Sequence, residues 1–154
     1  MSELPSQRLA ALGLTLPAVV PPVAAYVPAV RSGSFAYTSG QLPMVDGVMA
    51  ATGKVGASVS PEQAKELARA CALNALAALA DIIGGIDNVV RVVKVVGFVA
   101  SSPDFTGQPA VVNGASELLL EVFGEAGRHA RSAVGVAALP LDAAVEVELV
   151  VEVR

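Results

Sequence analysis

The longest stretch of helical spacing lies near the middle of the chain. Small and apolar side chains recur every three or four positions over residues 61–83, which predicts a helix with one buried face. Ser60 is a favourable N-cap, and Pro61 fits the first helical position. Gly84 and Gly85 follow the last periodic residue and end the predicted helix.

A β-branched segment and a second helical segment follow. Residues 89–100 are rich in valine almost throughout, which is typical of a central strand covered on two sides. Arg91 and Lys94 lie an odd number of positions apart, so we expect them on opposite faces of this strand. Residues 109–123 return to helical spacing with one apolar stripe and predict a second helix.

Shorter segments complete a predicted sheet. In the last of them, Glu146 and Glu148 alternate with apolar residues, so that strand has one apolar and one acidic face. The strands that we expect besides the central one are 25–31 and 34–38, joined by a turn at Gly33, and 132–139 and 145–153. This order predicts an α+β fold, a mixed sheet with two helices on one face. The other face is left bare, which predicts an oligomer closed by sheet faces.

The N-terminal segment differs from the rest of the chain. Residues 6–13 predict two helical turns that a glycine ends, and residues 14–24 are broken by prolines and predict extended chain. We therefore divide the chain into an N-terminal arm over residues 1–24 and a single domain over residues 25–154.

The N-terminal segment also indicates where in the cell we expect the protein. The uncharged run between Arg8 and Arg31 contains four prolines, which argues against a membrane-spanning helix. The first five residues lack the basic and apolar regions of a signal peptide. We therefore expect a cytoplasmic protein with no membrane partner.

Composition excludes several classes of function. With 154 residues, 54% hydrophobic and 16% charged, the chain has the size of one domain and is too apolar for a disordered tail. The formal net charge of −4 argues against a bulk electrostatic grip on nucleic acid. The single cysteine, Cys71, excludes an internal disulfide, and the single histidine, His129, excludes a histidine-rich metal site.

Two charged residues near the C-terminal strands are candidates for chemistry. Arg131 stands where a loop enters a buried strand, either as an exposed arginine or as a fork that binds a carboxylate bidentately. Glu146 lies on the acidic face of the last strand, either solvated or as a cleft carboxylate that orients or deprotonates water.

Three further residues could have either a structural or a functional role. Cys71 falls on the apolar stripe of the first long helix, which indicates an inert core thiol. Tyr26 and Asn113 fit ordinary packing or capping groups as well as polar groups of a site.

Several of these residues stand in motifs that resemble the RidA/YjgF family. The resemblance runs from residue 24 to the C-terminus, in order and with compatible spacing. The segments that carry it are Ala25–Val27, Tyr37–Pro43, Val112–Asn113, Arg131–Val134, Leu139–Ala143 and Val145–Glu148.

The resemblance implies a chorismate-mutase-like α+β fold, assembled as a homotrimer with three clefts between subunits. It also implies hydrolysis of reactive enamine and imine intermediates, such as 2-aminoacrylate, to 2-keto acids and ammonia, without a metal or organic cofactor. By the same resemblance, Arg131 holds the substrate carboxylate and Glu146 helps to position a water molecule. The residues implied to line the pocket are Tyr26, Ser39, Gly40 and Asn113.

The chain also departs from the family pattern. Ala133 and Gly135 stand where the family often has a cysteine and a glutamate, and His129 stands where it often has a proline. These changes remove a thiol and a carboxylate from the implied pocket, and His129 is a candidate replacement for the lost proton-transfer group. They favour, as an alternative, a non-catalytic trimeric module that binds small molecules or proteins. A third reading is a ribonuclease or translation inhibitor, which the acidic balance does not favour.

Overall fold

Both long helices predicted from apolar spacing are present in the computed structural model, which describes residues 2–22 and 24–154. Helix α2 spans Pro61–Ile83, and α3 spans Gln108–Phe123. At the start of α2, Ser60 Oγ accepts a hydrogen bond from the Gln63 backbone N–H at 3.1 Å. The helix ends at Gly84, whose φ of 80° suits a residue without a Cβ atom.

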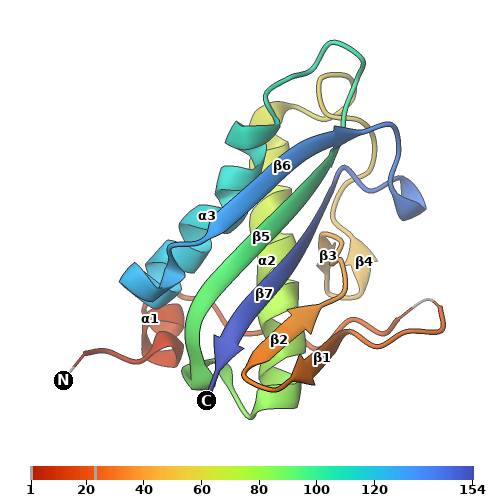
Figure 1. The fold of residues 1–154 in the computed structure, drawn as a ribbon. Coiled ribbons are helices and arrows are strands. Elements are labelled where there is room, and N and C mark those ends of the chain that lie inside the picture. The colour runs from red at the N-terminus through yellow and green to blue at the C-terminus, as the bar shows by residue number, and fades with distance from the viewer. Residues whose placement is uncertain (1, 23) are drawn as a thin grey trace.

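The sheet has five strands in the order β1-β2-β7-β5-β6. Central strand β5 pairs in parallel with β6 and antiparallel with β7, so the sheet is mixed and the predicted α+β class is confirmed (Figure 1). A small separate hairpin is made by β3 (Met44–Val45) and β4 (Val48–Met49). The bounds of the five strands are β1 Ala29–Ser32, β2 Phe35–Thr38, β5 Val89–Ala100, β6 Ala130–Val136 and β7 Val145–Val153.

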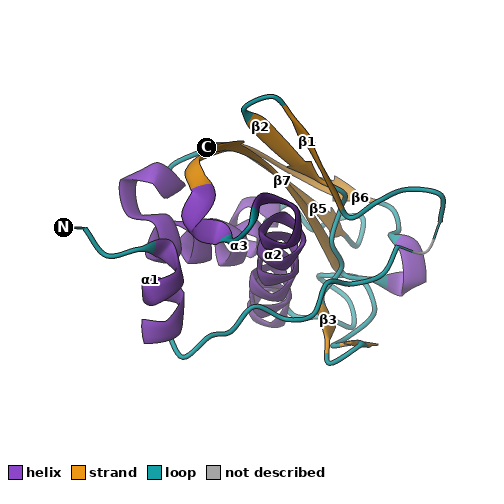
Figure 2. Cartoon of the chain, turned by 90° about the horizontal axis from the view of Figure 1, so that it is seen from below, coloured by secondary structure: helices purple, strands orange, loops and turns teal. Residues whose placement is uncertain are grey.

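The two faces of the sheet have different surroundings. Both α2 and α3 lie against one face, where the alternate residues of β7 from Val145 to Val153 are buried (Figure 2). No helix among the described residues covers the other face, which carries Glu146, Glu148 and the exposed side chains of Phe35 and Tyr37. The predicted bare face is therefore confirmed for the single chain.

The prediction that Arg91 and Lys94 lie on opposite faces is wrong. The pairing of β5 with β7 shifts register between Val89 and Arg91 and again between Val92 and Lys94. Each irregularity inserts a residue and restores the same orientation at the next pair. Both cations therefore project from the uncovered face.

Two predicted strands have different bounds in the structure. The first strand begins at Ala29 instead of residue 25, because the chain bends over residues 24–26, where the Tyr26 N–H donates to the Ala24 carbonyl at 2.9 Å. Strand β6 begins at Ala130 and ends at Val136, where it loses its partner, since β5 stops at Ala100 opposite that residue.

The N-terminal segment is packed against the domain. Helix α1 (Pro5–Ala11) contacts α3 and buries Leu9, and the predicted turns over residues 6–13 are thus confirmed in part. Residues 14–22 contain no helix or strand, and Leu14 and Leu16 pack on the core. The division at residue 24 stays a prediction. Within the described residues, no helix combines the length and apolar character needed to cross a membrane.

Candidate functional site

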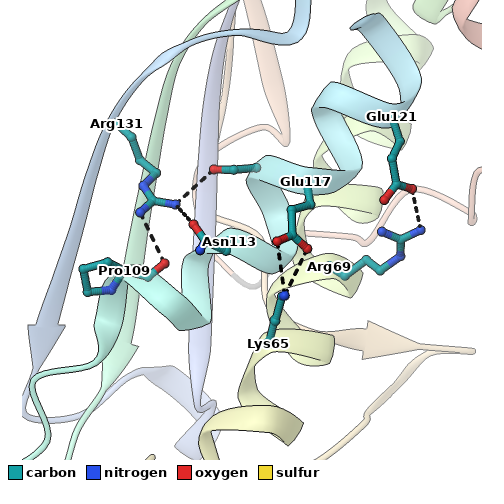
Figure 3. A network of polar contacts seen from close by, with 8 residues as sticks. Lys65, Arg69, Pro109, Asn113, Glu117, Glu121 and Arg131 are labelled. Carbon is teal, nitrogen blue, oxygen red and sulfur yellow. Dashed lines mark hydrogen bonds and ion pairs between the residues drawn. The ribbon is translucent and has the colours of Figure 1, made fainter.

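Arg131 lies on edge strand β6 and reaches toward α3. It pairs with Val95, a buried residue of β5, which places it on the helix-covered face of the sheet. Its Nη1 donates to Asn113 Oδ1 at 2.7 Å and to Ser116 Oγ at 3.2 Å, and its Nη2 donates to the Pro109 carbonyl at 3.2 Å (Figure 3). Helix α3 thus holds the guanidinium at three points.

The remaining donors of this guanidinium are free to bind a ligand. Of the five N–H groups of an arginine, the Nε–H and one Nη2–H have no hydrogen-bond partner among the described residues. Adjacent N–H groups of this kind form the fork that a carboxylate accepts. The half-buried Arg131 can therefore hold an anion without losing its contacts to α3.

His129 extends the same hydrogen-bonded group. Its Nδ1 lies 2.6 Å from the Gly127 carbonyl, and its Nε2 lies 2.9 Å from Ser116 Oγ. Burial lowers the pKa of His129 from its ordinary 6.5, and the Arg131 charge also lowers it, against the opposing effect of the bond to Gly127. The imidazole is therefore neutral at pH 7. We call Asn113, Ser116, His129 and Arg131 the arginine cluster.

Glu146 lies on β7 opposite Phe98, on the uncovered face of the sheet. Its side chain rests against the backbone of Gly40, where any Cβ atom would collide with Glu146 Oε1. Burial raises the pKa of Glu146 from its ordinary 4.5, and the charge of Glu148 raises it further. This carboxylate therefore exchanges its proton closer to neutral pH than an exposed glutamate does.

A cavity of about 300 Å³ is lined in part by Gly40, the residue whose backbone Glu146 contacts, but Glu146 itself does not line it. Tyr26 and Gly40 line it together with Val20 and Pro21 of the N-terminal segment. Ser39, next to Gly40, is bonded to the segment before β1: its hydroxyl donates to the Val27 carbonyl at 2.6 Å and its N–H donates to the Pro28 carbonyl at 2.8 Å. We call Tyr26, Ser39, Gly40 and Glu146 the glutamate cluster.

The six site residues expected from the sequence thus fall into two groups. Arg131 and Asn113 are in direct contact. In the other group, Tyr26 and Gly40 line one cavity, Glu146 lies against Gly40, and Ser39 precedes Gly40 in the chain. Within one chain the two groups lie on opposite faces of the sheet. Sequence reasoning missed Ser116, although its position three residues after Asn113 on a helix would have pointed to it.

The other positions singled out in the sequence have clear surroundings. Cys71 is fully buried, and burial raises the pKa of its thiol, which confirms the core reading. At Gly135, a Cβ atom would lie 2.7 Å from the Gln108 amide nitrogen, so Gln108 takes part of the space that a larger residue would need. Among the residues described, no group of three or more histidine, cysteine or acidic side chains could hold a metal ion.

Residues 6–153 match the family model described as YjgF/chorismate mutase-like, putative endoribonuclease. The chain belongs to this family. The RidA/YjgF resemblance seen in the sequence is thereby confirmed. One relative of this chain is protein TCP17 of Trypanosoma cruzi, 50% identical over 159 residues that cover 100% of this chain and 99% of that protein.

Solved structures of other proteins agree with this fold to different degrees. Protein Atu1372 of Agrobacterium tumefaciens, described as having unknown function, is 47% identical with a TM-score of 0.91, over 97% of this chain and 92% of that one. A putative endoribonuclease of Shewanella oneidensis is 34% identical with a TM-score of 0.95, over 98% of this chain and 100% of that one. The YjgF gene product of E. coli is 27% identical with a TM-score of 0.64, over 91% of this chain and 96% of that one. Because the first two alignments cover 97% and 98% of this chain, they include most of its N-terminal segment.

Proposed function

We propose that this chain is a cytoplasmic hydrolase that converts enamine and imine intermediates of the 2-aminoacrylate type into 2-keto acids and ammonia. Membership of the YjgF family supports the proposal, and so does the chemistry of the two clusters. The observation that carries it is the Arg131 guanidinium, which α3 holds at three points while two N–H groups stay open to a substrate carboxylate.

The reaction requires an oriented water molecule and a group that exchanges a proton. In the protonated imine, the carbon of the C=N bond is already electrophilic, so water adds to it as Glu146 accepts one proton from that water. The C=N π pair moves to nitrogen, and a carbinolamine forms. Glu146 then returns the proton to nitrogen, and the C–N bond breaks with its electron pair moving to nitrogen. As the ketone forms, the hydroxyl gives its proton to Glu146, which passes it to the departing ammonia, so ammonium leaves. The raised pKa of Glu146 suits these transfers.

The site that we propose forms between copies of the chain. Arg131 and Glu146 lie on opposite faces of one sheet, so a single chain does not direct both at one substrate. The uncovered face exposes large apolar side chains, including Val30, Phe35 and Tyr37, which favours its burial in an assembly. We propose a homotrimer with three shared clefts, and we expect light scattering to give three times the 15.5 kDa mass of the chain. A monomer would contradict the shared cleft.

One specific observation favours a second candidate function. The positions that often carry a thiol and a carboxylate in the family are Ala133 and Gly135 here, which leaves fewer groups for proton transfer. The alternative is therefore a trimeric module that binds small carboxylates without turning them over. A nuclease function, suggested by the family description, is less favoured because the net charge of −4 offers little to a phosphate backbone.

The test is a coupled assay in which a dehydratase generates the enamine and keto-acid release is followed above the spontaneous rate. We expect Arg131→Ala to lower the enzymatic rate about 100-fold or more, because two charge-assisted hydrogen bonds of about 1.5 kcal/mol or more each are lost. Arg128→Ala is the matched control, since Arg128 is exposed and pairs with Glu125. Equal rates for wild type and Arg131→Ala would remove the arginine from the reaction. Keto-acid binding without turnover would favour the alternative.

A further inference from the structure

A continuous chain of hydrogen bonds links Arg131 to the backbone of the preceding turn. Arg131 Nη1 contacts Ser116 Oγ at 3.2 Å, Ser116 Oγ contacts His129 Nε2 at 2.9 Å, and His129 Nδ1 contacts the Gly127 carbonyl at 2.6 Å. Ser116 is almost completely buried on α3, and His129 is half-buried just before β6. None of the motifs that carry the family resemblance includes Ser116 or His129.

Chemistry fixes the direction of every bond in this chain. A carbonyl oxygen only accepts, so His129 carries its proton on Nδ1 and donates to Gly127. In the neutral imidazole Nε2 then accepts, and the partner that can donate to it is the Ser116 hydroxyl. With its proton committed to His129, Ser116 Oγ offers a lone pair to Arg131. The imidazole thus sets the orientation of the hydroxyl that receives the guanidinium.

We propose that Ser116 and His129 are positioning residues for Arg131, and that binding of a substrate carboxylate to Arg131 is coupled to protonation of His129. This inference rests on the proposed role of Arg131 as the carboxylate anchor. The buried hydroxyl keeps Arg131 Nη1 turned toward α3, so the Nε and Nη2 edge stays presented to the ligand.

The coupling follows from the charges around the imidazole. The remaining charged groups on the neighbouring elements are Glu117 and Glu121 of α3, Glu125 and Arg128 of the preceding turn, and Arg91 and Lys94 of β5. Glu117 and Glu121 pair with cations of α2 (Figure 3). Glu125 pairs with Arg128. Arg91 and Lys94 project from the other face of the sheet, and Arg91 Nη2 donates to the Arg128 carbonyl at 3.1 Å. Arg131 is the charged group that lowers the pKa of His129.

A bound carboxylate changes this balance in one direction. It neutralises the guanidinium and adds a negative charge near the imidazole, so it favours the protonated form and raises the pKa of His129. By linkage, the affinity for the carboxylate rises as the pH falls from the pKa of His129 in the complex to its lower pKa in the ligand-free protein. Protonation does not release Arg131, because Ser116 Oγ has two lone pairs and can accept from both His129 Nε2–H and Arg131.

The chain contains one histidine, so the imidazole NMR signals report on His129 alone. The experiment is a pH titration of these signals in the wild-type protein with and without saturating pyruvate, with binding checked by calorimetry. We expect the Nδ1–H tautomer at neutral pH. We also expect pyruvate to raise the pKa of His129 by about half a unit or more. This is the effect of two unit charges, the carboxylate and the imidazolium, about 6 Å apart in a water-like dielectric. Arg131→Ala should abolish the shift. Identical titrations with pyruvate bound would overturn the coupling.

Two substitutions of His129 test the positioning role. His129→Gln keeps an acceptor for Ser116 but does not titrate, so we expect a KM near that of the wild type and a flatter dependence of KM on pH. His129→Leu removes the acceptor, and we expect KM to rise about 10-fold with little change in kcat, the effect of losing one hydrogen bond in ground-state binding. A KM for His129→Leu equal to that of the wild type would overturn the positioning role.

The outcomes separate this inference from the proposed function. If the wild type binds pyruvate with the histidine shift but hydrolyses no imine, the proposed function fails and the inference stands. If it hydrolyses imine while His129 titrates identically with and without bound pyruvate, the coupling fails and the function stands. If pyruvate does not bind at all, both fail.

Discussion

The arginine cluster and the glutamate cluster lie on opposite faces of one sheet and are built in different ways. Arg131 is held by three hydrogen bonds to α3, two of them from a single nitrogen. Glu146 makes no side-chain hydrogen bond among the described residues and rests against the bare backbone of Gly40. A charge fixed by many partners suits the holding of an anion, because little order is lost on binding. A carboxylate without partners, partly removed from water, suits the exchange of a proton.

Each cluster lacks a group that the other cluster has. The arginine cluster has open N–H donors but no base other than His129, which is committed to Ser116. The glutamate cluster has a cavity and a titratable carboxylate but, among its four members, no cation to hold an anionic substrate. We propose that each is completed by the other cluster of a neighbouring copy.

Mixing two inactive variants tests the pairing with the largest effect. Arg131→Ala and Glu146→Gln should each turn over little substrate alone. After they are unfolded together and reassembled at equal amounts, about one quarter of wild-type activity should return, because half of the chains supply each intact cluster to a heterologous interface. The coupled keto-acid assay measures the recovery.

The controls for this experiment are each variant refolded alone and the double variant mixed with either. None of them should regain activity, since no cleft can then contain both intact clusters. Recovery that stayed at the level of the separate variants would mean that both residues act within one chain.

Gly40→Ala should damage the glutamate cluster and spare the arginine cluster. The added methyl group would collide with Glu146 Oε1 and displace the carboxylate from its place against the Gly40 backbone. We expect turnover to fall by about 100-fold, at the low end of what a positioned acid or base contributes. Pyruvate affinity, measured by calorimetry, should fall much less.

Gly33→Ala is the control for introducing a side chain at a glycine. It lies in the β1–β2 turn, where a Cβ atom meets nothing within 4 Å. Its φ of 61° makes the substitution cost some stability, but turnover per folded chain should be unchanged. If Gly40→Ala were as active as Gly33→Ala, the placement of Glu146 against Gly40 would not matter to the reaction.

The sequence predicted the elements with long regular periods and missed local irregularities. Residues 61–83 carry six turns of one pattern with a cap at one end and glycines at the other, so α2 has the predicted bounds. Strand β5 was predicted over its full length, but its bulges were not, because an inserted residue leaves no distinct signal in a run of valines.

The candidate site was predictable in its residue types and not in its geometry. The motifs pointed to Arg131, Asn113 and Glu146, but their division between two faces depends on the registers of β6 and β7 against β5. Neither register can be derived from the spacing of residues within one strand. The contact of Ser116 with His129 joins a helix to a later turn, so it too depends on tertiary packing.

The pH dependence of kcat should distinguish the two clusters. Because burial raises the pKa of Glu146 above 4.5, kcat should rise with pH through an acidic limb that lies above that value. Glu146→Gln should remove this limb from the little activity that remains. Any effect of His129 should fall on KM instead, since it acts through the carboxylate anchor.

The titration of Glu146 should also make the free energy of unfolding fall as the pH rises. A glutamate whose folded pKa is raised contributes stability below its unfolded pKa, and this is lost as the pH rises through the folded pKa. Thermal unfolding should therefore show Glu146→Gln to be more stable than the wild type at pH 8, relative to their difference at pH 4. A constant difference between the two proteins across this range would mean that Glu146 titrates as it does in the unfolded chain.

The smallest expected effect comes from the neighbour of Glu146 on the same strand. Glu148 lies two residues along the uncovered face, and its charge is the second cause of the raised pKa of Glu146. Glu148→Gln should therefore move the acidic limb of kcat to lower pH while leaving pyruvate affinity unchanged. Glu152→Gln is the matched control, because Glu152 lies on the same face opposite Phe35 of β2, farther from the site. If both variants moved the limb equally, the shift would reflect the net charge of the face. A shift confined to Glu148→Gln would identify the limb with the carboxylate of Glu146 and not with the arginine cluster.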